Sequence, residues 1–200
     1  MSQAYVRPPQ VNPFLTWLSR RILHALGWKV LGPLPPYPKL VVVGVPHTSN
    51  WDGVVMVLAA WSERVQPKWM GKHTLFKPPF GWLMRRIGGV SIDRRAKHNA
   101  VEQAVQAFAR EQEMVLVIAP EATRKKMAGW RTGFYYIALG AGVPLALAAM
   151  DYDRKEVRIN QVLHPSGDLE ADIAQMREYF ENTQGLRPEN QGPIVLLPRP

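Results

Sequence analysis

The chain of 200 residues contains no cysteine, so disulfide bonds and thiolate chemistry are excluded. Acidic residues are also few: 16 Asp and Glu stand against 25 Lys and Arg, giving a formal net charge of +9. A basic balance of this size favours a polyanionic partner, either nucleic acid or an anionic membrane surface. The lack of cysteine fits a reducing compartment.

The sequence also lacks a run that is long and apolar enough to span a membrane. The longest uncharged stretch, residues 132–150, falls just short of the roughly 20 residues that a span needs, and two glycines and Pro144 divide it. Arginines at positions 20 and 21 interrupt the apolar N-terminal stretch, which argues against a secretory signal. We therefore expect a peripheral protein on the cytoplasmic side of the membrane.

Short apolar runs alternate with segments of helical periodicity along the chain. This alternation predicts an α/β domain with a largely parallel sheet flanked by helices. The runs predict strands at residues 40–45, 67–72, 90–92, 115–119, 143–150 and 157–162, the last as an edge strand. Helices are expected at residues 13–26, 54–61, 82–87, 99–110, 132–139 and 169–180.

The N-terminal segment is predicted to be an amphipathic helix. Asn12 and Pro13 form a good helix start, and the apolar face is expected to consist of Leu15, Leu18, Ile22 and Leu26. Such a helix either lies in a membrane interface or packs on the domain. We assign residues 1–36 to a membrane-contacting segment with a stiff Pro- and Gly-rich connector, and residues 37–200 to the main domain.

His47 and Asp52 are the strongest candidates for catalysis. His47 follows the buried strand at 40–45, and Asp52 falls in the first turn of the next helix. Ligands bind beyond the carboxyl ends of strands in open α/β sheets. A carboxylate that accepts from one imidazole nitrogen leaves the other nitrogen free to act as a base. The alternative is structural, because residues 49–52 also fit a helix capping box.

Polar residues follow two other predicted strands and could form an anion pocket beside His47. Arginine suits phosphate because its planar fork binds two oxygens. Surface charges, or pairs with neighbouring acids, are the alternative interpretation. No convincing set of metal ligands is present, since the other histidines are scattered. The candidates for this pocket are Arg94, Arg124 and Lys72, and Glu121 and Thr123 follow the same strand as Arg124.

Four segments of the chain form a recognisable series: residues 47–52 (HTSNWD), 72–94, 120–124 (PEATR) and 143–145 (VPL). Together, and in this order, they resemble the lysophospholipid acyltransferase family of the 1-acylglycerol-3-phosphate acyltransferase type, with residues 47–52 matching its His-x-x-x-x-Asp box. In the second segment the matching residues are Leu75, Pro79, Gly81, Gly89, Ile92 and Arg94. Ala122 departs from the family's glycine, and Leu147 stands where a second proline is usual.

The resemblance implies acyl transfer to the hydroxyl of a lyso-lipid such as lysophosphatidate, with His47 as general base and Asp52 orienting it. It also implies that Arg94 and the segment 121–124 bind the acceptor's polar head. Acyl-CoA or acyl carrier protein would be the co-substrate, and no cofactor or metal is required. An anionic membrane surface is the expected further partner.

Two rival interpretations remain. One is an acyltransferase of the same family with a different lyso-lipid acceptor. The other is a non-catalytic basic module that binds lipid or nucleic acid, for which basic residues should cluster on one face among aromatics. Several basic residues instead follow strand ends near the His-Asp pair, so an enzyme is favoured and nucleic acid is disfavoured.

Overall fold

The computed structural model describes residues 10–92 and 99–197. Seven strands form one sheet in the order β1-β7-β6-β2-β5-β3-β4. Strands β2 to β6 are mutually parallel, whereas β7 runs antiparallel to β6 and pairs in parallel with β1. The strands are β1 (Lys29–Leu31), β2 (Lys39–Val45), β3 (Lys68–Lys72), β4 (Gly89–Ile92), β5 (Met114–Ile118), β6 (Leu145–Asp151) and β7 (Glu156–Leu163).

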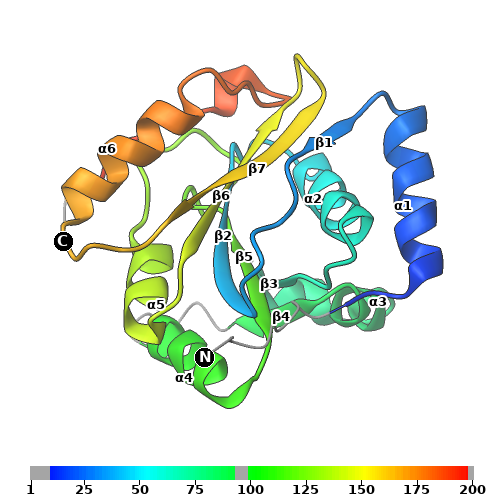
Figure 1. Ribbon diagram of the computed structural model, residues 1–200, viewed down its shortest axis with the longest axis horizontal. Helices are drawn as coiled ribbons and strands as arrows, with labels where there is room; N and C mark the ends of the chain where they lie inside the picture. The colour runs from blue at the N-terminus through cyan, green and yellow to red at the C-terminus, as the bar shows by residue number, and fades with distance from the viewer. Residues whose placement is uncertain (1–9, 93–98, 198–200) are drawn as a thin grey trace, which may run out of the picture.

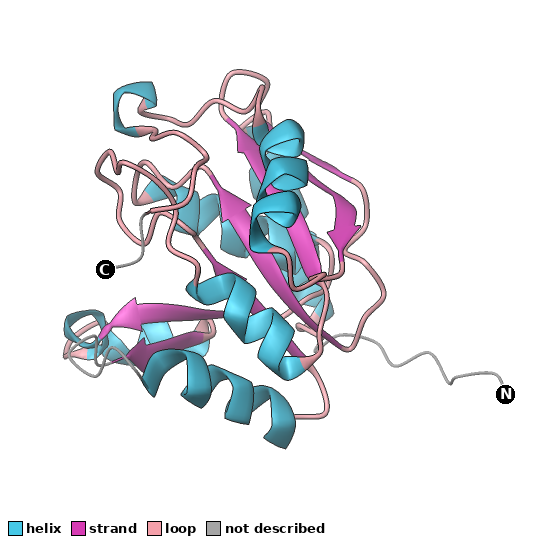
Figure 2. Ribbon diagram, turned by 90° about the vertical axis from the view of Figure 1, so that its left-hand side faces the viewer, coloured by secondary structure: helices cyan, strands magenta, loops and turns pink. Residues whose placement is uncertain are grey.

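Helices cover both faces of this sheet (Figure 1). One face carries α4, α5 and α6, and the other carries α1 and α2 (Figure 1). Figure 2 shows the sheet from the side of α4 to α6, with the strands behind the helices. The bounds are α1 (Pro13–Ala25), α2 (Trp51–Ser62), η1 (His73–Phe76), α3 (Gly81–Arg86), α4 (Asn99–Arg110), α5 (Gly133–Ala141), α6 (Leu169–Phe180) and η2 (Pro188–Asn190). The predicted α/β architecture with a largely parallel sheet is confirmed.

Strand β2 lies at the centre of the sheet and is buried on both faces. Val41, Val43 and Val45 pack into the core beneath α4, α5 and α6. Leu40 and Val42 face the opposite way, into the core beneath α2. A strand buried on both sides needs apolar residues throughout, which is why residues 40–45 form a continuous hydrophobic run.

The sequence predicted an edge strand at residues 157–162, but the corresponding strand β7 lies inside the sheet, between β1 and β6. Residues 29–31, within the predicted connector, form β1 and pair with residues 156–158 of β7. The described edges of the sheet are therefore β1 and β4. A strand of three residues gives too short a pattern to predict from sequence, so the interior position of β7 could not be inferred.

Helix α1 begins as predicted but buries a different face. Asn12 Oδ1 accepts a hydrogen bond from the Phe14 N–H at 2.8 Å, which caps the helix. Its fully buried residues are Thr16, Ser19 and Leu23. Of the predicted apolar face, Leu15, Leu18 and Ile22 are half-buried and Leu26 is exposed. The two small polar side chains allow α1 to lie close against α2, and the Arg20 side chain donates to the Ser62 carbonyl at 2.9 Å. Aromatic residues of α1 consequently face outward.

In the described part of the chain, no helix combines the length and the apolar character needed to cross a bilayer.

Candidate active site

Loops that follow β2, β5 and β6 meet beyond the carboxyl ends of these strands, because the three strands are parallel neighbours. His47 lies in the loop after β2, with its side chain 28% exposed. Asp52 lies in the first turn of α2 and is buried. Both positions are as predicted: the histidine precedes the helix, and the carboxylate reaches back toward it.

The imidazole of His47 contacts the carboxylate of Asp52 directly. Nδ1 lies 3.3 Å from Asp52 Oδ2. A carboxylate there favours the tautomer that carries its proton on Nδ1, so Nε2 keeps a lone pair. The pair is therefore arranged as a base with its orienting group.

Asp52 is held by a dense set of hydrogen bonds. Its Oδ2 accepts from the backbone N–H groups of Thr48 at 2.6 Å and Ser49 at 2.7 Å. Its Oδ1 accepts from the Ser49 hydroxyl and from the Tyr152 hydroxyl, each at 2.8 Å. Burial opposes ionisation, but the bonds from His47, Ser49 and Tyr152 outweigh it and lower the pKa of Asp52. The carboxylate thus stays charged beside the imidazole.

The helix-capping contacts and the contact between His47 and Asp52 occur together. Ser49 Oγ accepts from the Trp51 N–H at 3.1 Å while it donates to Asp52. The helix-capping residue itself, Asn50, makes no side-chain capping bond. One carboxylate therefore satisfies the loop's N–H groups and also contacts His47, so the helix start fixes the position of the pair.

Glu121 joins the pair from the loop after β5. Its Oε1 accepts from the backbone N–H of His47 at 3.1 Å, whereas Oε2 is buried and has no hydrogen-bond partner among the described residues. Burial raises the pKa of Glu121, with a further contribution from the nearby Asp52 charge. The structure therefore places Glu121 against the backbone of the loop that carries His47, with one buried oxygen that has no partner among the described residues.

The other predicted binding residues are placed less closely. Thr123 is half-buried, and its hydroxyl accepts from the Lys125 N–H at 3.4 Å. Arg124 is exposed in the same loop as Glu121. Lys72 is the last residue of β3, at the carboxyl end of that strand, and only its backbone is described. Arg94 lies outside the described residues.

Ala122 has a φ of 55°, in the left-handed region that favours glycine. Its N–H donates to the Ala119 carbonyl at 3.0 Å, which closes a tight turn after β5. This is the position at which the sequence departs from the glycine of the resembled family. In this chain an alanine occupies the left-handed position of the turn.

Sequence reasoning missed Tyr152. It follows β6 directly, and its ring packs edge-on against Trp28 at a centroid distance of 4.8 Å. Burial, together with the hydrogen bond to the Asp52 carboxylate, raises the pKa of the Tyr152 hydroxyl, so it remains a donor. The available signal was its position at the carboxyl end of a parallel strand beside β2.

A C-terminal segment, residues 183–191, also reaches the catalytic loop. We call it the strap. The Arg187 N–H donates to the Thr48 hydroxyl at 3.2 Å, and the Asn190 side chain approaches the Thr48 carbonyl at 3.5 Å. The Gln184 carbonyl accepts from the Tyr152 N–H at 2.9 Å. The strap therefore contacts both the loop of His47 and the tyrosine that binds Asp52.

A narrow apolar cavity of about 40 Å³ lies between α2 and the sheet. Gly44, three residues before His47, lines it together with Val117 and Ala148, while Met56 lines it from α2 and Glu63 from just after that helix. The cavity therefore includes strand positions next to the catalytic loop. Among the residues that the structure describes, no cluster of three His, Asp or Glu side chains is arranged to hold a metal ion.

Comparison with known proteins adds an independent observation. The family model described as Acyltransferase matches residues 31–150, more than half of the chain. The chain is 30% identical over 122 residues to 1-acyl-sn-glycerol-3-phosphate acyltransferases of Salmonella typhimurium and Salmonella typhi. These matches cover 58% of this chain and 49% of each relative, so the chain spans about half the length of the curated relatives it matches.

A solved structure shares the fold. The crystal structure of the 1-acyl-sn-glycerophosphate (LPA) acyltransferase PlsC from Thermotoga maritima superposes with a TM-score of 0.61 at 17% sequence identity. The superposition covers 84% of this chain and 76% of that one. At this identity the likeness concerns the fold. The strap lies beyond the residues that the family model matches.

Proposed function

This chain belongs to the acyltransferase family, and on that premise we propose that it transfers a fatty acyl group from a thioester to the hydroxyl of a lysophospholipid such as lysophosphatidate. The observation that carries the proposal is the contact between His47 and Asp52, beyond the carboxyl ends of the parallel strands. The names of the relatives support lysophosphatidate as the acceptor.

In the proposed reaction, His47 Nε2 removes the proton from the acceptor hydroxyl as its oxygen attacks the thioester carbonyl carbon. Asp52, held ionised by its hydrogen bonds, stabilises the imidazolium that forms. Collapse of the tetrahedral intermediate breaks the carbon–sulfur bond, and the imidazolium returns the proton to the thiolate. The products are an ester and a free thiol, from either acyl-CoA or acyl carrier protein, and the steps need neither a nucleophile from the enzyme nor a metal.

We assign acceptor binding to the loop after β5. Glu121 Oε2 has no partner among the described residues and would accept from an acceptor hydroxyl. Exposed Arg124 would bind the acceptor's phosphate, with Thr123, Lys72 and Arg94 as the further predicted contacts. The left-handed Ala122 lies between Glu121 and Thr123 and directs the loop.

The apolar cavity beneath α2 is the proposed site for the start of the acyl chain. Its lining is almost wholly apolar, and Gly44 brings it within three residues of His47. A Cβ at Gly44 would make an ordinary contact of 3.8 Å with Val117 Cγ1, and a larger side chain would extend into the cavity. Replacing Gly44 by valine is expected to shift the preferred donor toward shorter acyl chains.

A member of the family with another lyso-lipid acceptor is the second candidate, and the replacement of glycine by Ala122 in the acceptor loop favours it. Helix α1, with its exposed aromatic residues, is the proposed contact with the cytoplasmic face of the membrane.

The test is thiol release from acyl-CoA or acyl carrier protein, measured with a panel of lyso-lipid acceptors. Release that depends on lysophosphatidate supports the first candidate, and release with another acceptor only supports the second. Arg124→Ala should raise the KM for a phosphate-bearing acceptor by about tenfold, the value of one charged hydrogen bond. Lys126→Ala, which removes an exposed charge from the same loop, is the matched control. No release with any donor and acceptor would contradict both.

A further inference from the structure

Residues 64–92 contain six lysines and arginines and no aspartate or glutamate. The structure places this segment at one edge of the sheet, where it forms β3, η1, α3 and β4. The proposed chemistry uses Lys72 alone from the described part of the segment. The remaining basic and aromatic residues have no role in the site.

Phe80 and Trp82 project outward from the start of α3. Each is 66% exposed, and they are the most exposed large hydrophobic side chains among the described residues. Gly81 between them is buried against the backbone of Phe76, where a Cβ would collide with the Phe76 carbonyl oxygen. The glycine therefore packs inward and leaves both aromatic neighbours on the outside.

Three cations lie close to these two aromatic residues in the sequence. Lys77 precedes them in the turn, and Arg85 and Arg86 end α3. The Arg85 guanidinium stacks over the Phe76 ring at 5.7 Å from its centroid. In the part of the chain that the structure describes, none of the three cations forms an ion pair with a carboxylate. Their charge is available to an anionic partner.

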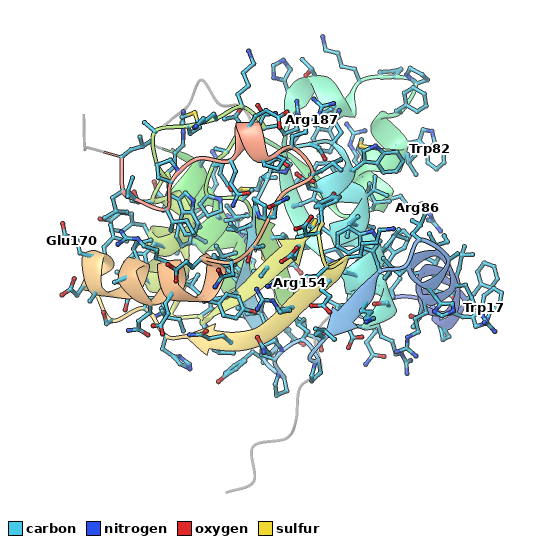
Figure 3. The ribbon with its side chains drawn as sticks, turned by 90° about the horizontal axis from the view of Figure 1, so that it is seen from above. Trp17, Trp82, Arg86, Arg154, Glu170 and Arg187 are labelled. Carbon is cyan, nitrogen blue, oxygen red and sulfur yellow. The ribbon has the colours of Figure 1, made fainter. Side chains whose placement is uncertain are left out.

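Helix α1 presents similar chemistry on the same side of the molecule. Figure 3 shows Trp17 of α1 on the same side as Trp82 and Arg86 of α3, away from Glu170. Phe14 and Trp17 are 62% and 53% exposed, and their rings stack with centroids 6.0 Å apart. Figure 1 likewise draws α1 and α3 on one side. The two helices thus offer apolar rings flanked by positive charge.

We propose that the segment of residues 75–86, with α1, is a docking surface for an anionic phospholipid bilayer. Tryptophan and phenylalanine suit the interface, where the ring is buried and the surroundings are polar. Each Lys or Arg near an anionic surface strengthens binding about fivefold. Exposed rings together with unpaired cations fit a bilayer better than a protein groove, because a groove would have to neutralise these cations while it covers the rings. The surface adds a second contact to α1, and the proposal does not depend on acyl transfer.

The test is co-sedimentation with phosphatidylcholine vesicles that contain 0, 20 or 40% phosphatidylglycerol. Phe80→Ser/Trp82→Ser should reduce partitioning into the anionic vesicles at least tenfold. Lys77→Glu/Arg85→Glu/Arg86→Glu should remove the dependence on phosphatidylglycerol. Leu139→Ser is the matched control, because Leu139 is an exposed hydrophobic residue on α5, across the sheet from α1. It should bind as the wild type does.

Phe14→Ser/Trp17→Ser separates the contribution of α1 from that of α3. The surface is overturned if Phe80→Ser/Trp82→Ser binds as tightly as wild type while the α1 variant alone loses binding. The proposal is equally overturned if the wild type does not bind the vesicles, or if its binding does not depend on their phosphatidylglycerol content. Hydrogen exchange of the wild type needs no variant: residues 75–86 should gain protection when anionic vesicles are added, and unchanged exchange there would contradict the proposal.

Discussion

The Tyr152 hydroxyl donates a hydrogen bond of 2.8 Å to Asp52 Oδ1, across 100 positions of sequence. The bond links the end of β6 to the first turn of α2. It also occupies the carboxylate oxygen that does not face His47, so Tyr152 takes part in positioning the pair without touching the imidazole.

Tyr152→Phe should lower kcat/KM about fivefold, because a typical hydrogen bond contributes about 1 kcal/mol. Ionised Asp52 has a lowered pKa, so its stabilisation is present above the usual value of 3.8 and is lost as the pH falls through the lower folded value. The deficit in Tm of the variant should therefore be present at neutral pH and shrink below pH 3.8.

Tyr179→Phe is the control for this variant, since its hydroxyl donates to the Arg158 carbonyl at 3.0 Å, away from the pair. It should lose stability but keep kcat/KM. An unchanged kcat/KM in Tyr152→Phe would show that the tyrosine is only structural.

The position of His47 and Asp52 could be predicted because local features determine it. A buried run that stops at Pro46 marks the end of a strand. Two residues five positions apart cannot lie on the same face of one helix, so His47 must precede the helix that carries Asp52. Tyr152 and the strap depend on which strands become neighbours and where a polar C-terminal segment packs. Neither produces a periodic pattern, so only the structure reveals them.

The buried face of α1 could not be predicted for a related reason. Periodicity identifies an apolar stripe, but close packing on α2 selects the small side chains Thr16 and Ser19 instead. Glu121 was singled out as a binding residue by its place after β5, and the structure places its carboxylate against the His47 backbone. Its bond to the His47 backbone requires the register between β2 and β5, which the sequence does not specify.

Glu121→Gln should become more stable than wild type as the pH rises. A carboxyl whose folded pKa is raised contributes stability below its ordinary value of 4.5, and the contribution is lost as the pH rises through the folded value. The amide keeps an acceptor for the His47 N–H but carries no charge. The Tm of the variant minus that of wild type should therefore be larger at pH 7.5 than at pH 4. Thermal shift should show an increase in this difference of about 1 °C or more.

Glu178→Gln reports the effect of removing an exposed carboxylate from α6. A difference for Glu121→Gln that stays constant over this pH range would contradict the buried, raised carboxyl.

Ala122→Gly should stabilise the protein. The left-handed backbone costs an alanine about 1–2 kcal/mol, a strain that glycine does not have. The greater entropy of the unfolded chain with glycine reduces this gain in stability by about 0.4–1 kcal/mol. The net gain of about 0.5–1 kcal/mol predicts a rise in Tm of about 1–4 °C. Ala109→Gly, in the exposed face of α4, should instead lower Tm by a similar amount. A lower Tm for Ala122→Gly would contradict the strained turn.

Gly185→Ala tests the strap. A Cβ at this position would lie 2.8 Å from the Thr48 side chain and 3.0 Å from Pro46, so the strap must move away from the catalytic loop. We expect kcat to fall at least threefold with a smaller change in the donor KM, because the loop carries His47. Gly133→Ala, whose Cβ would make an ordinary contact of 3.9 Å, is the matched control. Equal activity of the two variants would separate the strap from catalysis.

The central claim is that His47 is the general base, and one assay tests it most directly. Thiol release from acyl-CoA is measured with and without lysophosphatidate in wild type and in His47→Ala, with thermal shift confirming that both are folded. Wild type should release thiol only when acceptor is present, and His47→Ala should lose about 10²–10⁴-fold of that rate. Acceptor-dependent release at the wild-type rate in His47→Ala would contradict the mechanism.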